Sequence, residues 1–506
     1  MPDRFDRKIT RFGYIINKRS LSDDQLNIIK TDLTVKPFIM KAFAGRKDNS
    51  FKLYVENGDY IGIPKYYGLE KFGKPEINRL EVYLYPKQLM TFTGKLRPRQ
   101  EIIVKNILDG FNKHRGGLLI AQCGIGKTLL AIYIACALGL KTLFLVHKNF
   151  LKNQFIDRAI TYTNVKKVGT IQGKKIDTDY PFVVGMIQSL VKNDYDDSLF
   201  KDFGLIIIDE VHHMGARNFS KIYQKMTAKY MLGITAEQKR NDGMYKILHM
   251  YMGPTLHMEP IKINNMVIVK RFHYKTDNKK RSKVIINKYT KEPDRSTMIS
   301  NLVFIKRRNR FIINLINELH AEGKHVLVLS GRLKQINLFH KLLDAEEYTK
   351  GAVGKYIGGM PTKELDKSAT KPIILGSYEM ASEGLDIPSL NVVILCTPKS
   401  AIKQSVGRIL RKDVYDEYPI VIDIIDDDNS VLRRQSNTRL AYYNKQQYNI
   451  QEFKVADYEL DKYMKSDDIL AIQEAIKLEP SKKKQKEKPK FSGPLNVEDI
   501  EFLDDD

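Results

Sequence analysis

Short apolar runs rich in Val, Ile and Leu recur along this chain, and helical stretches separate them. Runs of four to eight such residues are typical of parallel strands that are buried on both faces of a sheet. A first series contains "GGLLIAQ", "KTLFLVH", "PFVVGMI", "FGLIIIDE" and "YMLGITAE", and a second contains "KHVLVLSG", "KPIILGSY", "NVVILCTP" and "YPIVIDII". The pattern predicts an α/β protein in which two parallel-sheet lobes follow one another.

The length of 506 residues is too great for one compact core, so several domains are expected. In the N-terminal part, "SDDQLNIIKTDL" predicts a helix that Ser22 could cap. The C-terminal tail runs from a lysine block into an acidic block, a composition typical of disorder. We expect a small α+β N-terminal domain (1–90), a first lobe (91–260), a basic linker (261–300), a second lobe (301–455), and a C-terminal extension with a disordered charged tail (456–506).

The formal net charge of +24 predicts a polyanionic partner. Nucleic acid and anionic membrane are both candidates, and nucleic acid is favoured because no strongly amphipathic basic helix is evident. The three cysteines, Cys123, Cys136 and Cys396, have no paired spacing, which argues against a disulfide framework and a zinc finger. No apolar run approaches the ~18 residues that span a bilayer. We therefore expect a soluble intracellular protein with no membrane partner.

The segment "AQCGIGKT" (121–128) lies between a predicted strand and a predicted helix, as a phosphate-binding loop does. Backbone N–H groups from Gly124 to Thr128 would surround the phosphates of ATP at the helix N-terminus. Lys127 would reach the β- and γ-phosphates, and the Thr128 hydroxyl would ligate Mg²⁺. The predicted nucleotide-binding loop consists of Ala121, Gln122, Cys123, Gly124, Ile125, Gly126, Lys127 and Thr128, with Ala121 where the usual pattern has glycine.

Two acidic residues end the run "FGLIIIDE", at the carboxyl end of a predicted strand, where α/β sheets bind ligands. Asp209 would hold Mg²⁺, and Glu210 would orient the attacking water. The adjacent His212 and His213 point apart and have no third ligand nearby, so they do not predict a zinc site. A second acidic stretch, "DIIDDDN" (423–429), lacks the spacing of an EF-hand and is expected to be a solvated turn.

Together, the Gly-Lys-Thr loop, Asp-Glu-Val-His (209–212) and "QSVGRILR" (404–411) resemble the motifs of superfamily 2 helicases and translocases of the DExH type. "LVLSGR", "EGLDIP" and "VIDIIDDDNSVLRRQSNTRLAYY" resemble the branch that includes the XPB-type proteins, phage UvsW and the transcript-release helicases of poxviruses. The first 90 residues look like the versions carried by large DNA viruses. The resemblance covers roughly residues 10 to 455. It implies two tandem RecA-like lobes, use of ATP and Mg²⁺, and action on nucleic acid.

The resemblance also implies roles for particular residues. Gln100, in "LRPRQ", would read adenine, and Gly384 and Asp386 would contact the ribose and couple the lobes. Gln404 heads a segment in which Arg408 and Arg411 share one helical face and would act as arginine fingers across the cleft. Strand contacts are expected from Lys148, Gly173, Gln188, Arg332 and Gly358. The usual Ala-Thr-Pro is Ala236-Glu237-Gln238 here, a departure that bears on coupling to unwinding rather than on hydrolysis.

These features favour an ATP-dependent helicase or translocase that works on nucleic acid, DNA before RNA, through the phosphate backbone. A double-strand translocase or remodelling ATPase without strand separation stays open, as do a small-molecule kinase and a non-catalytic nucleic-acid binding module. A kinase has no need of the second lobe with "QSVGRILR", and intact Lys127, Asp209 and Glu210 argue against a relic site. We expect a monomer that serves transcription or replication machinery and, if viral, acts in the host cytoplasm or virion.

Overall fold

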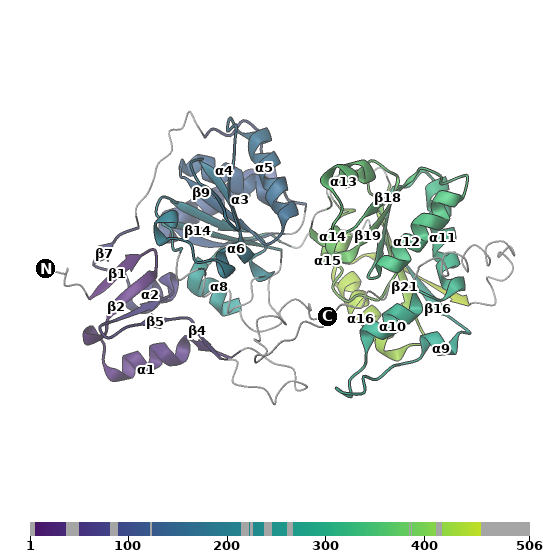
Figure 1. Ribbon diagram of the computed structural model, residues 1–506, viewed down its shortest axis with the longest axis horizontal. Coiled ribbons are helices and arrows are strands. Elements are labelled where there is room, and N and C mark those ends of the chain that lie inside the picture. Colours follow the sequence, from purple (N-terminus) through teal and green to yellow (C-terminus); the bar gives the residue numbers. More distant parts are fainter. Residues whose placement is uncertain are drawn as a thin grey trace. The chain divides into compact units, whose positions relative to one another are not determined.

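A computed structural model gives the fold of the protein, which divides into two compact units, Met1–Ile261 and Lys262–Asp506 (Figure 1). The structure describes residues 6–36, 50–80, 90–121, 124–213, 222, 226–236, 245–260, 267–383, 385, 387–410 and 417–456. The expected tail beyond residue 456 and the departure at Glu237 and Gln238 lie outside these ranges. Within them, no helix is long and apolar enough to cross a membrane.

The N-terminal residues form a sheet of order β5-β6-β2-β1-β7, covered by α2 and flanked by α1. The predicted cap of α1 is confirmed: Ser22 Oγ accepts from Gln25 N at 3.2 Å, and Gln25 Oε1 accepts from Ser22 N at 3.0 Å. The elements are β1 (Arg7–Thr10), β2 (Gly13–Asn17), α1 (Asp23–Asp32), β3 (Thr34–Val35), β4 (Phe51–Lys52), β5 (Val55–Glu56), β6 (Tyr60–Ile63), α2 (Lys65–Phe72) and β7 (Ile77–Asn78).

The first lobe is an eight-stranded sheet of order β11-β10-β12-β9-β13-β14-β8-β15, parallel except at β11. The five predicted strands are confirmed as β8, β9, β12, β13 and β14. The strands are β8 (Gly116–Ile120), β9 (Thr142–Val146), β10 (Gly169–Gln172), β11 (Lys175–Asp177), β12 (Phe182–Met186), β13 (Leu205–Ile208), β14 (Tyr230–Thr235) and β15 (Thr255–Met258). The helices are α3 (Pro98–His114), α4 (Lys127–Leu138), α5 (Asn149–Tyr162), α6 (Ile187–Lys192) and α8 (Tyr245–Met252).

Both faces of this sheet are covered, which explains the continuous apolar runs. Helices α3, α4 and α5 pack on one face, where Leu119 of β8 contributes to the core. On the other face, Leu118 and Ile120 of β8 share one core with α6, α8 and the N-terminal sheet. The N-terminal domain is therefore packed onto the first lobe rather than tethered to it.

The second unit is a seven-stranded, fully parallel sheet of order β18-β19-β17-β20-β21-β16-β22. The four predicted strands are confirmed as β17, β19, β20 and β21. The strands are β16 (Ile268–Lys275), β17 (Val326–Ser330), β18 (Val353–Tyr356), β19 (Ile373–Ser377), β20 (Val392–Leu395), β21 (Ile420–Asp426) and β22 (Asn449–Ala456). The helices are α9 (Lys279–Ser282), α10 (Arg295–Leu302), α11 (Lys306–Ala321), α12 (Leu333–Ala345), α13 (Thr362–Ala369), α14 (Tyr378–Glu383), α15 (Lys403–Val406) and α16 (Ser430–Lys445).

The basic linker expected over 261–300 is corrected by the structure, because β16 lies inside the second sheet between β21 and β22. Arg271 of β16 is only 3% exposed. Its guanidinium pairs with Asp423 of β21 at 3.6 Å and with Glu452 of β22. The charge of Arg271 is neutralised by carboxylates that lie far away in the sequence, so a basic residue here belongs to a buried strand and not to a linker.

The solvated turn expected for "DIIDDDN" (423–429) is wrong for its first four residues, which end β21 with Asp423 fully buried and Asp426 nearly so; the turn is confined to Asp427 and Asp428. Arg439 of α16 binds Asp423 at 2.8 Å. Arg308 of α11 binds Asp426 through two nitrogens at 2.6 and 3.0 Å. Both carboxylates therefore form buried ion pairs inside the second unit.

A buried lysine, Lys65, begins α2 and joins the N-terminal domain to the first lobe. The residue is 4% exposed, and its amine donates to the carbonyls of Ala228 and Lys229 at 3.1 and 3.0 Å. Burial, reinforced by the charge of Arg115, lowers the pKa of Lys65 to about 7. An unfolded lysine keeps its proton up to pH ~10, so the folded and unfolded states differ in protonation between these values.

We expect Lys65 to make stability rise with pH above 7. The unfolded chain binds the extra proton in this window, and stability increases with pH wherever that holds. The difference in unfolding free energy between wild type and Lys65→Met should change by up to about 2 kcal/mol from pH 7 to pH 9, in favour of the wild type. Urea unfolding of both proteins at the two pH values measures it. A difference that is the same at both pH values would contradict a neutral folded lysine.

Candidate active site and nucleic-acid interface

The predicted phosphate loop joins β8 to α4, and its conformation depends on glycine. Gly126 adopts a left-handed φ of +84° as the N-cap of α4. A Cβ at Gly126 would lie 2.6 Å from the side-chain nitrogen of Gln100. Gly124 also has a positive φ, of +90°, whereas Gln122 and Cys123 lie outside the described residues. The structure thus gives a physical reason why another residue is harder to accommodate at position 126, whereas alanine stands at position 121.

Gln100, the predicted adenine reader, braces this loop from α3. It is 4% exposed, and its Oε1 accepts from Arg97 N at 2.8 Å. Its Nε2 donates to the carbonyl of Ile125 at 2.8 Å. Each amide atom retains capacity for one further hydrogen bond, so base reading stays a prediction while the bracing contact is a feature of the structure.

The lysine of the loop meets the acidic strand end in an ion pair. Lys127 Nζ lies 2.7 Å from Glu210 Oε1, and the two side chains are 11% and 14% exposed. Glu210 has φ of +46°, a region that costs a non-glycine residue ~1–3 kcal/mol and marks functional sites. The strained turn directs the Glu210 carboxylate back toward the phosphate loop.

Asp209 lies beside this pair and is 8% exposed. Burial and the neighbouring charge of Glu210 raise the pKa of Asp209 to about 6, although Lys127 opposes the shift. The ionised form of a carboxyl with a raised pKa is stabilised by a divalent cation next to it. Asp209 and the hydroxyl of Thr128, in the first turn of α4, are the oxygen donors that fit Mg²⁺, with phosphates and water completing its shell.

His212 extends the network to a third strand. Its Nδ1 lies 2.8 Å from Thr235 Oγ1, at the end of β14, and 3.3 Å from Glu210 Oε2. The sequence places His212 at the end of Asp-Glu-Val-His (209–212) and argues against a zinc ligand, but it does not predict these contacts. A chain of polar contacts therefore runs from Lys127 through Glu210 and His212 to Thr235.

In the second unit, Arg408 contacts backbone carbonyls close in sequence to Gly384 and Asp386, the predicted ribose contacts. Its guanidinium donates to the carbonyls of Ala381 at 2.6 Å and Leu385 at 3.1 Å. Gln404 is half-buried in α15. Gly384, Asp386 and Arg411 lie outside the described residues. Because the two units are described separately, the role of the arginines toward a nucleotide on the first lobe stays a prediction.

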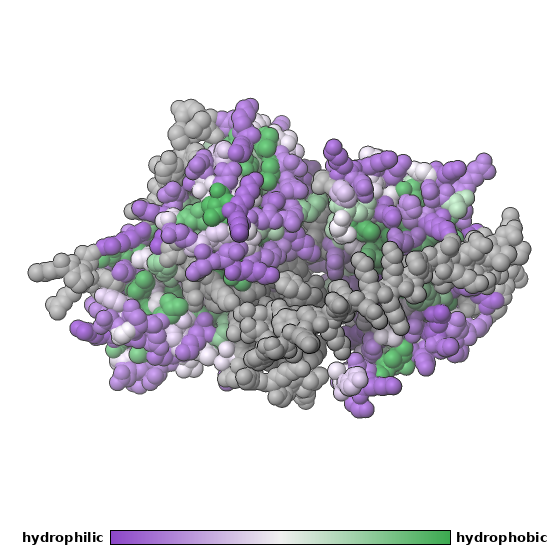
Figure 2. Space-filling view, in the orientation of Figure 1, coloured by the Kyte–Doolittle hydropathy of each residue, from purple (hydrophilic) through white to green (hydrophobic). Residues whose placement is uncertain are grey.

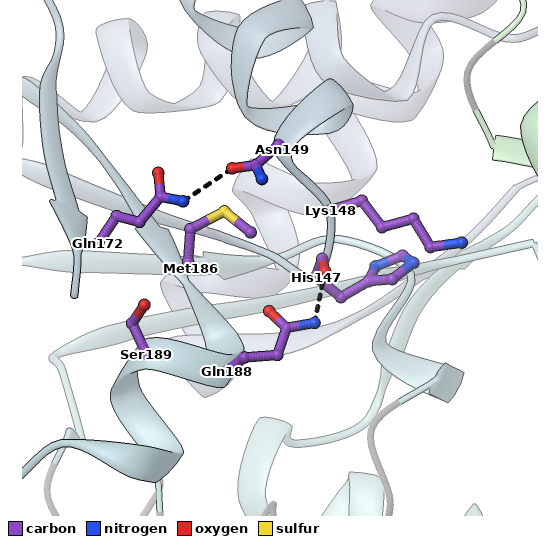
Figure 3. Close-up of a pocket in the computed structure, with 7 residues that line it drawn as sticks. All are labelled: His147, Lys148, Asn149, Gln172, Met186, Gln188 and Ser189. Carbon is purple, nitrogen blue, oxygen red and sulfur yellow. Dashed lines mark hydrogen bonds between the residues drawn. The ribbon is translucent and has the colours of Figure 1, made fainter. Parts of the chain in front are cut away.

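A concave pocket of about 380 Å³ opens at the carboxyl ends of β9, β10 and β12 in the first lobe (Figure 3). Two predicted strand contacts, Lys148 and Gln188, line it, and Gly173 follows the lining residue Gln172. The full lining is His147, Lys148, Asn149, Gln172, Met186, Gln188 and Ser189. The structure thus brings together the three strand contacts predicted for the first lobe.

Hydrogen bonds to one another and to the backbone fix the polar side chains that line the pocket. Gln188 Nε2 donates to the carbonyl of His147 at 2.5 Å, and Gln172 Nε2 donates to Asn149 Oδ1 at 2.9 Å (Figure 3). Gly173 N donates to Ser189 Oγ at 3.0 Å, and its φ of +58° suits glycine. Such a lining of amides, a hydroxyl and one lysine matches the contacts that proteins make to a sugar–phosphate backbone.

His147 links this pocket to the acidic site, a connection that no sequence pattern indicated. Its carbonyl accepts from Gln188 in the pocket. Its imidazole lies in the surroundings of Asp209. His147 therefore belongs both to the lining of the pocket and to the surroundings of Asp209.

Arg332 and Gly358, the strand contacts predicted for the second lobe, follow β17 and β18. Arg332 Nε donates to Ser300 Oγ at 2.9 Å, and its Nη2 donates to the carbonyl of Ser296 at 2.7 Å. Both serines belong to α10, in the segment first taken for a linker. Gly358 is exposed, and a Cβ at this position would have open space around it.

Two family models match the chain. Residues 93–240 match the res subunit of type III restriction enzymes, and residues 307–413 match the conserved C-terminal domain of helicases. A protein of Acanthamoeba polyphaga mimivirus, whose name assigns it an ATP-dependent RNA helicase activity, is 56% identical over the full length of both chains. A protein of Invertebrate iridescent virus 6 named as a helicase is 25% identical over 71% of this chain and 83% of its own.

A solved structure of Mss116p bound to single-stranded RNA and AMP-PNP resembles the fold, with a TM-score of 0.52 at 13% identity over 75% of this chain and 80% of that chain. Yeast Dbp5 bound to RNA and ADP BeF3 gives a TM-score of 0.50 at 13% identity over 76% and 94% of the two chains. At this identity the likeness concerns the fold alone. It agrees with the two tandem RecA-like lobes that the sequence predicts.

We expect Gly126→Ala to weaken ATP binding about tenfold or more, since strained φ values cost ~1–3 kcal/mol and the new methyl group displaces Gln100. Gly323→Ala is the matched control, because Gly323 has φ of +74° but open space around it. Titration with a fluorescent ATP analogue measures both. Equal affinities for the two variants would contradict a role of the Gly126 conformation in nucleotide binding.

Proposed function

The chain belongs to the superfamily 2 helicases that large DNA viruses encode, and from this premise we propose that it couples ATP hydrolysis to stepwise movement along a nucleic-acid strand. The main support for the proposal is that Lys127, Glu210 and Asp209 lie next to one another where β8 and β13 end. ATP-dependent helicase activity is the property of the family. Each step of that activity can be assigned to residues of this chain.

The ion pair between Lys127 and Glu210 keeps both side chains engaged until ATP binds. An incoming γ-phosphate competes with Glu210 for Lys127, because a phosphate carries more negative charge than one carboxylate. Released from Lys127, Glu210 is free to accept a proton from the attacking water and to orient it. Asp209 and Thr128 would hold Mg²⁺, which would supply positive charge to the phosphates.

The second unit contributes charge in the transition state. Arg411, with Arg408, would stabilise the transferring phosphoryl group once the lobes close over ATP. Gln404, Gly384 and Asp386 would sense that closure. Because one chain carries both sets of residues, we propose a monomer as the working unit, in the host cytoplasm or virion.

Nucleic acid binds through its backbone rather than through base edges. The pocket around Lys148 and Gln188 offers polar contacts suited to phosphate and sugar, and hydrophilic side chains dominate the visible described surface of both units (Figure 2). The net charge of +24 adds affinity that falls steeply with salt. The resemblance to the branch of XPB-type proteins and phage UvsW favours DNA, whereas the name of the mimivirus relative specifies RNA. The experiment below therefore uses both nucleic acids.

Lys127→Ala should reduce nucleic-acid-stimulated ATP hydrolysis by roughly 10²-fold or more, the size of effect seen when a preorganised charge is removed. Turnover is measured with single-stranded DNA, duplex DNA and RNA at matched salt, followed by strand displacement. Lys166→Ala, at an exposed lysine of the same lobe, is the control and should behave as wild type. Turnover of Lys127→Ala at the wild-type rate would refute the site, and a wild type that no nucleic acid stimulates would refute the proposed function.

Arg411→Ala should leave ATP binding intact and lower turnover roughly 10³-fold or more, by the size of arginine-finger effects. The physical reason is that the guanidinium meets charge that develops only in the transition state. Arg434→Ala, at an exposed arginine of α16, is the control. Single-turnover hydrolysis with bound ATP separates binding from chemistry, and an unchanged rate for Arg411→Ala removes the finger role.

A further inference from the structure

Between α9 and α10 the chain doubles back as an ordered hairpin, residues 283–294, which reaches out from the second unit (Figure 1). Ile286 and Pro293 form an antiparallel bridge. Asn287 N donates to the carbonyl of Glu292 at 2.8 Å. At the tip, Asn287 Oδ1 accepts from Tyr289 N at 2.9 Å and from Thr290 N at 3.2 Å. The turn is therefore defined by its own hydrogen bonds.

This 283–294 hairpin presents apolar surface to solvent. Tyr289 at its tip is 96% exposed, more than any other large hydrophobic residue in the described part of the chain, and Ile286 and Val284 are 50% and 39% exposed. Single exposed apolar residues are common, but three within six residues on one ordered turn are not explained by packing. Because the backbone of Tyr289 is already held, a partner that stacks on its ring loses little ordering entropy.

The surroundings of the ring are cationic. Residues 279–295 contain seven Lys and Arg side chains and only two carboxylates. One of those, Asp294, is used to cap α10, accepting from the backbone N and the hydroxyl of Thr297 at 2.9 and 2.7 Å. Lys288 and Lys291 flank the tip and are exposed. An aromatic ring among lysines is the combination that single-stranded nucleic acid selects, stacking on bases and neutralising phosphates.

The base of the hairpin is anchored beside a predicted strand contact. On one side, the buried Asn429 donates to the carbonyl of Ser282 at 3.1 Å while it caps α16. On the other side, the chain enters α10, whose Ser296 and Ser300 hold the guanidinium of Arg332. The tip and Arg332 are thus attached to the same helix within the second unit.

We propose that the 283–294 hairpin is a nucleic-acid contact in which Tyr289 stacks on an unpaired base while Lys288 and Lys291 meet neighbouring phosphates. The proposal rests on the proposed function, since it supplies a base contact to the strand that Arg332 would engage. A nucleobase fits better than a protein side chain because the surrounding charge selects a polyanion. It fits better than a membrane because three exposed apolar side chains on one narrow turn give far less area to insert than an amphipathic helix does.

The absence of tryptophan from the chain permits a direct test. Tyr289→Trp introduces a single indole whose fluorescence should be quenched when single-stranded oligonucleotide is added, because the ring stacks on a base. Tyr418→Trp is the matched control at another exposed tyrosine of the second unit, 54% exposed, and its emission should not change. If Tyr289→Trp emission is unchanged while anisotropy of a labelled strand shows binding, the proposal is overturned.

Affinity measurements separate stacking from charge. Tyr289→Ala should weaken single-strand binding about 5- to 100-fold, from the usual contribution of base–aromatic stacking, with the slope of log Kd against log salt unchanged. Tyr289→Phe should restore the affinity, and Tyr418→Ala should bind as wild type. The double variant Lys288→Ala, Lys291→Ala should instead lower the salt slope by about 2.

These outcomes distinguish the hairpin from the proposed function. A wild type that nucleic acid stimulates, together with a Tyr289→Ala protein that binds and displaces strands equally well, overturns the hairpin proposal alone. A wild type that neither binds nor responds to nucleic acid overturns both. Misfolding is not expected to confuse the result, since the ring is solvated, and thermal unfolding of each variant checks it.

Discussion

The ion pair between Lys127 and Glu210 is the interaction on which the nucleotide site depends. It exists because β8 and β13 run parallel on either side of β14, so that the loop after β8 and the turn after β13 emerge at the same edge. Both side chains are largely buried, and removing one would leave the other as an uncompensated charge. Under the proposed function, the pair leaves the site preorganised for a competing anion such as a phosphate.

Buried ion pairs also organise the second unit. Asp423 and Asp426 of β21 are held by Arg439 of α16 and Arg308 of α11. Burial alone would lower the pKa of Arg439, but the adjacent charge of Asp423 outweighs it and raises that pKa. Such pairs contribute little net stability, because desolvation offsets their attraction. They do restrict which strand and helix can pack together, and we infer that they set the position of β16 and thereby of the hairpin and α10 that follow it.

Both units carry their predicted strand contacts where parallel strands end, as open α/β sheets generally do. In the first lobe, His147 lies between the pocket and Asp209. In the second unit, Arg408 braces the segment around Leu385, and α10 braces Arg332. These residues are therefore positioned by neighbours that also belong to other functional segments, an arrangement suited to transmitting a change from nucleotide to strand.

Local pattern alone determined the nine apolar strands, the Ser22 cap, the phosphate loop and the acids that end β13. These features depend on residues near one another in the sequence, where periodicity, capping and turn chemistry operate. The partners of Arg271, Asp423 and Asp426 depended on the tertiary structure, because they lie on other strands and helices, 16 to 181 residues away in the chain. For the same reason the sequence predicts a linker where the structure has β16. The contacts of Gln100 and His212 also depend on the tertiary structure, because they form only where the ends of β8, β13 and β14 lie at one edge of the sheet.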